Sequence, residues 1–409
     1  MMSWVTTSWS NVCTLNYGKA LKNYKHFDSS YPVYGSGGIV GSTDTPIAPA
    51  KRPIVARKGT LTVYWSEDAS HIIDTAYWLE PKETVDPHWA YFAVKNLDIS
   101  TLASGTGVPS LSRDDFYREE VALPPLSEQK IIAHILGTLD DKIELNQKMS
   151  QTLEEIAKAI FKSWFMDFDP VRAKAEGRPA GLPPEINDLF PDELVGSEIG
   201  EIPKGWALKP IYELANFING AAYKKFEPNK EGLGLPIIKI AELKSGVSEQ
   251  TGFSTVDMGE KYLIRQKDIL FSWSGNPDTS IDTFVWHRDD AWLNQHIFKV
   301  VPNDDVPRSF LLQLLRSKKP IFTEIARNKQ TTGLGHVTVK DLKEMQIALP
   351  DLGLFNSALK TLEAVQERVF LCERENLILA ELRDTLLPKL ISGELRIPDA
   401  EKFLEEAGI

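Results

Sequence analysis

Two long stretches of the chain place apolar residues at steps of three and four. We call these positions the seam, and in the first stretch they are Ile132, Leu136, Leu139, Ile143, Asn146, Met149, Leu153, Ile156, Ile160 and Trp164. In the second, they are Leu362, Val365, Val369, Cys372, Asn376, Leu379, Leu382 and Leu386. This spacing puts the apolar side chains on one helix face, as in a coiled coil. We predict long helices over 126–168 and 351–395, the first starting near Glu128 with Ser127 as N-cap and the second stopping near Pro388.

The rest of the chain alternates short β-branched or aromatic runs with turns rich in Gly, Ser, Asp and Pro. Residues 53–56 (PIVA) and 61–65 (LTVYW) are examples, and runs of this kind are typical of strands. The predicted organisation adds four segments to the helices: strand-rich domains over 1–125 and 206–350, a Pro- and Gly-rich linker with local turns over 169–205, and a tail over 396–409.

Residues 105–125 and 331–351 are two versions of one sequence, 226 positions apart. Six of the 21 aligned positions are identical: Thr106/Thr332, Gly107/Gly333, Asp115/Asp341, Ala122/Ala348, Leu123/Leu349 and Pro124/Pro350. Each copy precedes one of the long helices, which indicates a tandem duplication of a domain plus a helix. The expected fold class is α+β: two mixed α/β domains held apart by two long antiparallel coiled-coil helices, with a pseudo-twofold internal repeat. That each helix packs only on its own domain is the alternative.

The net charge of −11 argues at first against a nucleic-acid partner. The net charge, counted as the number of Lys and Arg residues less the number of Asp and Glu residues, is −2 for 1–125 and +2 for 201–350. It is −6 for 126–200 and −5 for 351–409. The acidity therefore lies mainly on the helical segments, and the nearly neutral domains can carry local basic faces. A DNA-binding chain of this charge would need partner subunits to neutralise much of the phosphate charge.

Several classes of protein and site are disfavoured. No apolar run approaches the roughly 20 residues that span a bilayer, and the N-terminus lacks a secretory pattern. Cys13 and Cys372 are far apart in sequence, which favours free thiols in a reducing cytoplasm. A phosphate-binding GxxxxGK[ST] loop, the aromatic tetrapeptide of amino-methyltransferases and metal-ligand spacing of histidines are all missing from the sequence. We expect a non-catalytic chain without a metal site.

Five motifs occur in a characteristic order along the chain. They are 32–39 (PVYGSGGI), 122–129 (ALPPLSEQ), 161–170 (FKSWFMDFDP), 200–206 (GEIPKGW) and 386–395 (LLPKLISGEL). In order and spacing, over essentially the whole length, the chain resembles the specificity subunit of type I restriction–modification enzymes. The second helix departs from the pattern, because it begins with Leu352-Gly353-Leu354-Phe355 and leaves its N-terminal cap open.

The resemblance implies a DNA sequence-specificity subunit in the cytoplasm of a bacterium or archaeon. Each domain would read one half of a bipartite target in double-stranded DNA, and the helices would set the spacing and dock two modification (methyltransferase) subunits. S-adenosylmethionine, ATP and Mg are expected on partner subunits and not on this chain. Whether restriction subunits with translocase and nuclease activity join them stays open. The alternatives are a self-sufficient methyltransferase–nuclease fusion and a non-DNA adaptor using the ten tryptophans.

Base reading needs Arg or Lys for guanine and Asn or Gln for adenine, with hydroxyls and amides on phosphates. The candidates in the first domain are Lys19, Lys22, Lys25, Tyr34, Ser36, Arg57, Lys58 and Thr106. In the second domain they are Asn219, Lys224, Lys225, Arg265, Ser274, Asn276, Lys329, Gln330, Thr331 and Thr332. For subunit docking, the seam suggests Leu139, Ile143, Leu153, Ile160, Leu379 and Leu386. Each could equally be a solvated or packed residue of its domain.

Overall fold

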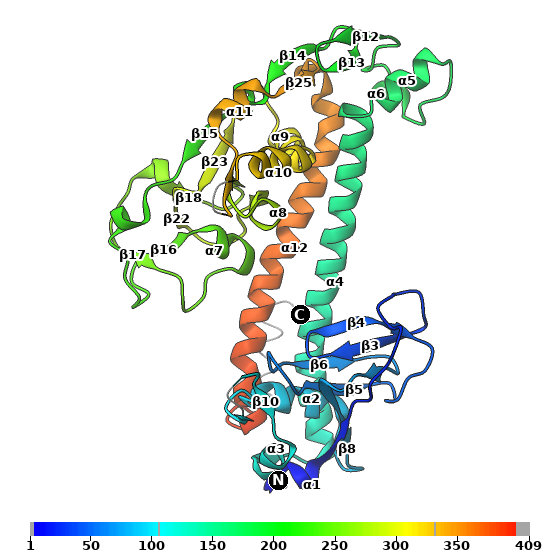
Figure 1. Ribbon diagram of the computed structural model, residues 1–409, viewed down its shortest axis with the longest axis vertical. Helices are drawn as coiled ribbons and strands as arrows, with labels where there is room; N and C mark the ends of the chain where they lie inside the picture. The colour runs from blue at the N-terminus through cyan, green and yellow to red at the C-terminus, as the bar shows by residue number, and fades with distance from the viewer. Residues whose placement is uncertain (1–3, 105–106, 331–332, 398–409) are drawn as a thin grey trace. The chain divides into compact units, whose positions relative to one another are not determined.

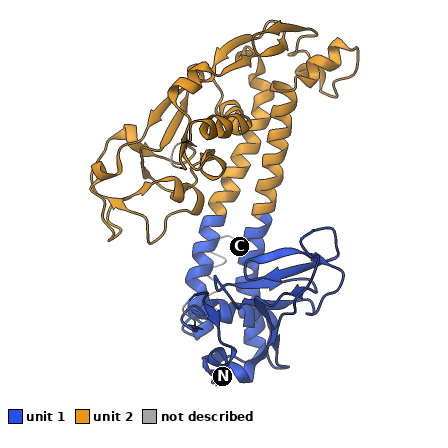
Figure 2. Ribbon diagram, in the orientation of Figure 1, with its two compact units in different colours: residues 1–145, 376–409 blue, residues 146–375 orange. Residues whose placement is uncertain are grey.

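A computed structural model describes residues 4–104, 107–330 and 333–397. The chain divides into two compact units, unit 1 (1–145 and 376–409) and unit 2 (146–375). Each unit contains one strand-rich domain, domain 1 or domain 2, and a stretch of each long helix, so both helices change colour partway in Figure 2. The helices are α4 (Leu126–Phe165) and α12 (Leu352–Ser392).

Domain 1 is built around a four-stranded sheet. Its order is β2 (Cys13–Tyr17), β8 (Ala76–Pro81), β5 (Arg52–Ala56) and β6 (Val63–Ser66). A three-stranded sheet has the order β4 (Gly38–Thr43), β3 (Tyr31–Gly35) and β7 (His71–Ile72). Two pairs complete the strands: β1 (Val5–Ser8) with β11 (Glu120–Leu123), and β9 (Ala103–Ser104) with β10 (Ser110–Leu111). The short helices are α1 (Trp9–Val12), α2 (Pro87–Asn96) and α3 (Arg113–Arg118).

Domain 2 repeats this plan with a longer middle section (Figure 1). Its main sheet has the order β15 (Ala215–Asn219), β23 (Ile297–Pro302), β19 (Ile269–Ser272) and β21 (Asp282–Val285). The second sheet has the order β17 (Phe253–Ser254), β16 (Leu235–Ile238), β22 (Ala291–Leu293) and β18 (Leu263–Ile264). The pairs are β14 (Ala207–Pro210) with β25 (Gln346–Leu349), and β20 (Ser274–Gly275) with β24 (Gly335–His336).

The helices of domain 2 include several single turns. The α-helices are α7 (Ile240–Ser245), α8 (Pro277–Ser280), α9 (Arg308–Ser317), α10 (Lys319–Asn328) and α11 (Val339–Glu344). The 3-10 turns are η1 (Ile211–Leu214), η2 (Tyr223–Phe226) and η3 (Glu260–Tyr262).

The duplication extends to individual backbone hydrogen bonds. The amide of Trp9 donates to Glu119 O in domain 1, and the amide of Ile211 donates to Met345 O in domain 2, at 3.0 and 2.9 Å. The short helix, closing strand and long helix each begin 226 positions after their counterparts, α11 after α3, β25 after β11 and α12 after α4. The expected internal repeat is therefore a structural repeat of the whole domain.

Both long helices differ slightly from their predicted ends. α4 starts at Leu126, one residue before the predicted N-cap, so Ser127 lies inside the helix. The buried Gln129 side chain joins the start of this helix to domain 1, because its Oε1 accepts a hydrogen bond from Asp86 N at 2.8 Å. α12 is preceded by Asp351, whose carboxylate accepts from Gly353 N at 3.0 Å. α12 continues through Pro388 to Ser392, so the predicted stop at the proline was one turn early.

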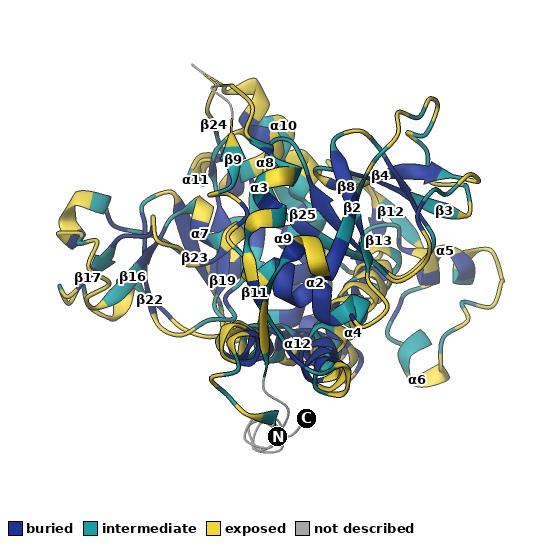
Figure 3. Cartoon of the chain, turned by 90° about the horizontal axis from the view of Figure 1, so that it is seen from below, coloured by how far each residue is buried: buried dark blue, intermediate teal, exposed yellow. Residues whose placement is uncertain are grey.

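In each unit, stretches of α4 and α12 pack together and also against the domain. In unit 2 the stretches are antiparallel, since Met149 Sδ lies 3.7 Å from Cys372 Sγ while the Phe165 and Phe355 rings are 5.6 Å apart. In unit 1 the buried residues Leu136 and Leu379 share one core with α2, which is among the dark-blue parts in Figure 3. The apolar seam therefore contributes to the two domain cores as well as to helix pairing.

The segment predicted as a linker has regular structure. It contains α5 (Asp169–Ala175), α6 (Pro184–Asn187) and the hairpin of β12 (Leu194–Ser197) and β13 (Gly200–Pro203). Val171, Phe190 and Ile202 are buried in the core of unit 2, so apolar burial orders a segment whose Pro and Gly content suggested only turns. Among the described residues, the helices are too short or too polar for a membrane span.

Candidate nucleic-acid interface

The main sheet of domain 1 brings two separated residues to one edge. β2 and β5 are both antiparallel to β8, which lies between them, so they run in the same direction. Tyr17 ends β2 and Arg57 directly follows β5, and therefore both lie at the same edge. The guanidinium carbon of Arg57 is 5.1 Å from the centre of the Tyr17 ring. This edge presents a cation on an aromatic platform.

A second arginine completes a cleft of about 260 Å³ at this edge. Arg113, the first residue of α3, places its guanidinium carbon 4.8 Å from the centre of the Tyr17 ring. Within the described residues, the Nε–H groups of Arg57 and Arg113 are both buried and without a hydrogen-bond partner. Burial, together with the neighbouring Tyr17, raises the pKa of Tyr77 in the cleft wall to about 12. At neutral pH the cleft therefore combines two arginines and the Asp114 side chain with the neutral phenol of Tyr77.

A basic loop starts at the same edge, directly after Tyr17. Gly18 is required there, because a Cβ would lie 2.0 Å from Ile73 O. The loop over 18–30 carries Lys19, Lys22 and Lys25, and all three are exposed. Exposed lysines beside a groove are suited to phosphate contacts, which supply affinity but little sequence information.

The corresponding edge of domain 2 has different chemistry. Asn219 ends β15 and Trp273 follows β19, at the positions that Tyr17 and Arg57 occupy in domain 1. The indole Nε1 of Trp273 donates to Asn219 Oδ1 at 3.1 Å, and its ring lies 5.8 Å from that of His336. Burial and then the nearby His336 lower the pKa of His296, whose ring is 5.9 Å from Trp273. This edge is therefore aromatic, with amide and imidazole groups in place of guanidinium groups.

Domain 2 also places a basic loop after its edge residue. Gly220 takes the role of Gly18, because a Cβ there would lie 2.1 Å from Asn294 O. The loop that follows contains the exposed Lys224 and Lys225, on η2. Both domains therefore combine a side-chain cluster at a sheet edge with a loop of exposed lysines.

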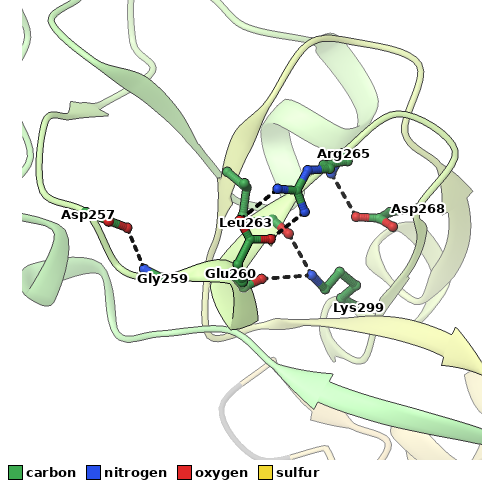
Figure 4. Close-up of polar contacts among 7 residues, drawn as sticks. All are labelled: Asp257, Gly259, Glu260, Leu263, Arg265, Asp268 and Lys299. Carbon is green, nitrogen blue, oxygen red and sulfur yellow. Dashed lines mark hydrogen bonds and ion pairs between the residues drawn. The ribbon is translucent and has the colours of Figure 1, made fainter.

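Arg265, a candidate from the sequence, is engaged elsewhere. Its guanidinium donates both Nη groups to the Glu260 carboxylate, at 2.5 and 2.8 Å, as Figure 4 shows. Its amide donates to Asp268 Oδ2 at 2.8 Å. Arg265 also precedes β19, whereas Trp273 follows this strand, so it lies near the opposite edge of the sheet. In this structure the arginine fork is occupied and lies away from the site.

Other candidates are placed inside the domains or in caps. Tyr34 is buried and donates its hydroxyl to Trp65 O at 3.3 Å, and Ser274 is buried with Oγ 2.9 Å from His336 Nδ1. The side chain of Asn276 caps α8 by accepting from two amides, and Lys329 is paired with Asp341. The polar patterns that suggested base contacts here satisfy the domain's own hydrogen bonds.

The remaining candidates are less constrained. Ser36 and Lys58 are partly exposed, and Gln330 is exposed just after α10. The backbone amide of Ser36 donates to Thr75 Oγ1 at 3.2 Å, and Lys58 forms an isolated β-bridge with Ser110. Three candidates lie outside the described residues: Thr106, Thr331 and Thr332.

The seam residues predicted for subunit docking need correction. Leu139, Leu379 and Leu386 are at most 2% exposed and lie in the core of unit 1, so they cannot present a surface to a partner. The partly buried positions are Ile143, Leu153 and Ile160. Other apolar residues of the helices face outward, among them Leu145, Ile156, Leu371 and Ile378.

Sequence reasoning missed several residues of the two edges. Asn219 was selected as a candidate, whereas its counterpart Tyr17 was missed, although the segments 16–18 (NYG) and 218–220 (ING) that contain them are similar. Arg113 lies inside the repeated segment, but α11 has Val339 at that position, so the repeat did not single it out. No sequence pattern marked Trp273 and His336 as site residues, because only strand pairing brings them together.

Fold and site together define a protein with two recognition domains of one architecture, each joined to a long helix. The chain belongs to the family of the type I restriction modification DNA specificity domain, whose model matches residues 1–155 and 203–369. It is 29% identical over 339 residues to the specificity subunit of the type I restriction enzyme HindI from Haemophilus influenzae, covering 73% of each chain.

Two further relatives agree with this assignment. The specificity subunit of the type I restriction enzyme MjaIX from Methanocaldococcus jannaschii is 24% identical, over 91% of this chain and 81% of that one. The crystal structure of a type I restriction-modification S subunit from M. genitalium has the same fold. Its TM-score is 0.65 at 17% identity, covering 95% of this chain and 96% of that chain.

Proposed function

We propose that this chain is the DNA sequence-specificity subunit of a type I restriction–modification system and is not itself catalytic. Domain 1 reads one half of a bipartite target and domain 2 reads the other. The observation that carries the proposal is the duplicated sheet edge, where each domain joins a distinct side-chain cluster to a loop of exposed lysines. Loops of this kind supply phosphate contacts, and the clusters differ enough to read different bases.

The partners follow from the same proposal. Two modification subunits carry S-adenosylmethionine and the adenine methyltransferase site, while ATP and Mg belong to restriction subunits where these are present. The exposed apolar residues Leu145, Ile156, Leu371 and Ile378 are the docking positions that we favour, because they lie on the long helices and outside both cores. Buried seam residues serve the fold of the chain itself.

The direct test is methylome sequencing of cells that express this chain together with a modification subunit from the same organism. The expected result is methylated adenine within a bipartite motif, present only when both proteins are expressed. Methyl transfer by the purified chain alone, with labelled S-adenosylmethionine, would instead support the fused-enzyme alternative. An unmethylated genome in spite of an assembled complex would contradict the proposal.

Docking can be tested separately from folding. Glu in place of Leu145 or Ile378, which are 54% and 56% exposed, should prevent co-purification with the modification subunit and leave the melting temperature nearly unchanged. The matched control is Leu379→Glu, which places a charge in the core and should lower the stability of the free chain by about 3 kcal/mol or more. Normal assembly of both surface variants would show that the docking face lies elsewhere.

Spacing can be tested by lengthening both helices. One added heptad after Gln147 in α4 and one after Arg374 in α12 keep the seam in phase and add roughly 10 Å. The tolerated spacer should grow by about three base pairs, at about 3.4 Å per base pair, with both half-site sequences unchanged. An active variant that methylates the original spacer would refute the role of the helices in setting the distance.

A further inference from the structure

Arg113 has an environment that a purely structural arginine would not need. Its side chain forms no hydrogen bond or ion pair with the described residues, and its Nε–H is buried without a partner. A buried unpaired donor costs free energy, and more so on a charged group. Arg57, across the same cleft, has the same unpaired Nε–H. Two such groups in one cleft indicate a ligand that accepts hydrogen bonds.

The cleft also holds Arg113 in a defined orientation. The guanidinium carbon lies over the Tyr17 ring, 4.8 Å from its centre. The backbone below it is fixed as well, because Ser112 Oγ caps α3 by accepting from Asp115 N at 3.2 Å. A planar fork held in one orientation is suited to two parallel hydrogen bonds, which a flexible surface arginine forms less readily.

The other polar groups of the cleft indicate that its ligand is a base pair and not a phosphate. Asp114 lies in the lining with its carboxylate unpaired among the described residues, beside the hydroxyls of Ser104 and Ser110. A carboxylate repels a phosphate but accepts a hydrogen bond from the N4 amino group of cytosine, and an arginine fork matches O6 and N7 of guanine. Arginine and aspartate in one cleft therefore match the two halves of a G·C pair.

We propose that Arg113, supported by Arg57 and Asp114, reads one G·C base pair in the half-site of domain 1. This inference rests on the proposed function, and it adds to it the base class and the residue that selects it. Arg113 donates to guanine, Asp114 accepts from the paired cytosine, and the Tyr17 ring supports the guanidinium group of Arg113.

The test uses the purified complex of the full chain with its modification subunits. Methylation rates are measured on the duplex carrying the methylome motif and on duplexes with each base pair of the motif replaced in turn. The wild-type complex should discriminate against loss of one G·C pair by about 5- to 150-fold, the range for a bidentate contact. In Arg113→Gln and Arg113→Lys this discrimination should fall toward unity at that position alone. Lysine keeps the charge but loses the fork.

The matched control is Arg118→Gln, in the same helix. Arg118 is 76% exposed, pairs with Asp115 and does not line the cleft. This variant should keep the wild-type discrimination at every position. Co-elution of each variant with the modification subunits establishes that it has folded and assembled.

Three results would overturn the inference. In the first, both Arg113 variants lower the methylation rate on every duplex by one common factor, as expected for a phosphate contact. In the second, both retain wild-type discrimination. In the third, both variants fail to assemble with the modification subunits, which would show that Arg113 has a structural role and not a base-reading one. A wild-type complex that methylates no bipartite motif would refute the proposed function itself, whereas a bipartite motif without a G·C pair in the half that Arg113 affects would refute only this inference.

Discussion

The two sheet edges share a backbone and differ in side-chain chemistry. The amide of Leu111 donates to Arg57 O at 2.8 Å, and the amide of Val337 donates to Trp273 O at the same distance. Around these matching bonds, domain 1 gathers two guanidinium groups over Tyr17, whereas domain 2 joins Trp273 to Asn219 beside His336. The scaffold therefore fixes where the clusters lie, and a few side chains at strand ends determine their chemistry.

The largest expected effect comes from exchanging a whole domain. Replacing residues 1–120 with the corresponding domain of another member of the family should change one half of the methylated motif completely, because all the side chains of one edge are replaced together. The other half should stay the same. Methylome sequencing measures both halves at once, and a change in both would show that the edges do not act separately.

Trp273→Ala should have a smaller effect, confined to the half-site of domain 2. It removes the aromatic platform and the bond to Asn219 Oδ1, so discrimination at one position should fall by about 1–3 kcal/mol, or roughly 5- to 150-fold. Rates on single-substitution duplexes measure this. Trp273→Phe serves as the control, since it keeps the ring and loses only the indole donor. A loss in the half-site that Arg113 affects would contradict the separation of the two edges.

The basic loops should contribute affinity without selectivity. Double replacement of Lys22 and Lys25 by Ala should weaken binding to all sequences by a similar factor, and so should replacement of Lys224 and Lys225. The slope of log Kd against log salt should fall by about one for each lysine–phosphate ion pair that the replacement removes. Lys340→Ala is a suitable control, because Lys340 is exposed on α11 and paired with Glu344. Position-dependent losses would instead mean that the loops read bases.

The two units should also differ in how their stability responds to pH. Burial, and then the surrounding arginines, lower the pKa of His287 in unit 2 to about 4. In unit 1, burial lowers the pKa of His88, but Asp86, Asp141 and other carboxylates oppose the shift. The unfolded state binds the proton more tightly than folded His287, so unit 2 loses stability as pH falls below about 6.5, by about 2 kcal/mol at pH 5.

Hydrogen exchange at pH 7 and pH 5, corrected for intrinsic rates, resolves the two units. Unit 2 should lose more protection than unit 1, and His287→Gln should remove most of this difference. Equal losses in the two units, or an unchanged difference in the variant, would show that His287 does not dominate the response.

Local pattern alone was sufficient for the long helices, the two domains and the duplication. The apolar steps through Leu136 and Leu362 recur within single helices, so the sequence carries them directly. The five ordered motifs indicated the family, which the family model then matched over most of the chain. The predicted linker was the exception, because Phe190 and Ile202 become ordered only by burial against residues distant in sequence.

The composition of each cluster depended on tertiary structure. Arg57 was selected from its residue type, but Arg113 joins it only because α3 starts beside the end of β5. Tyr34 and Leu379 looked available in the sequence, and packing buries both. The sequence by itself determined which elements form, because helix and strand periods are local. Only the tertiary structure decided which polar groups face a cleft, because strand pairing and core packing join residues far apart in the chain.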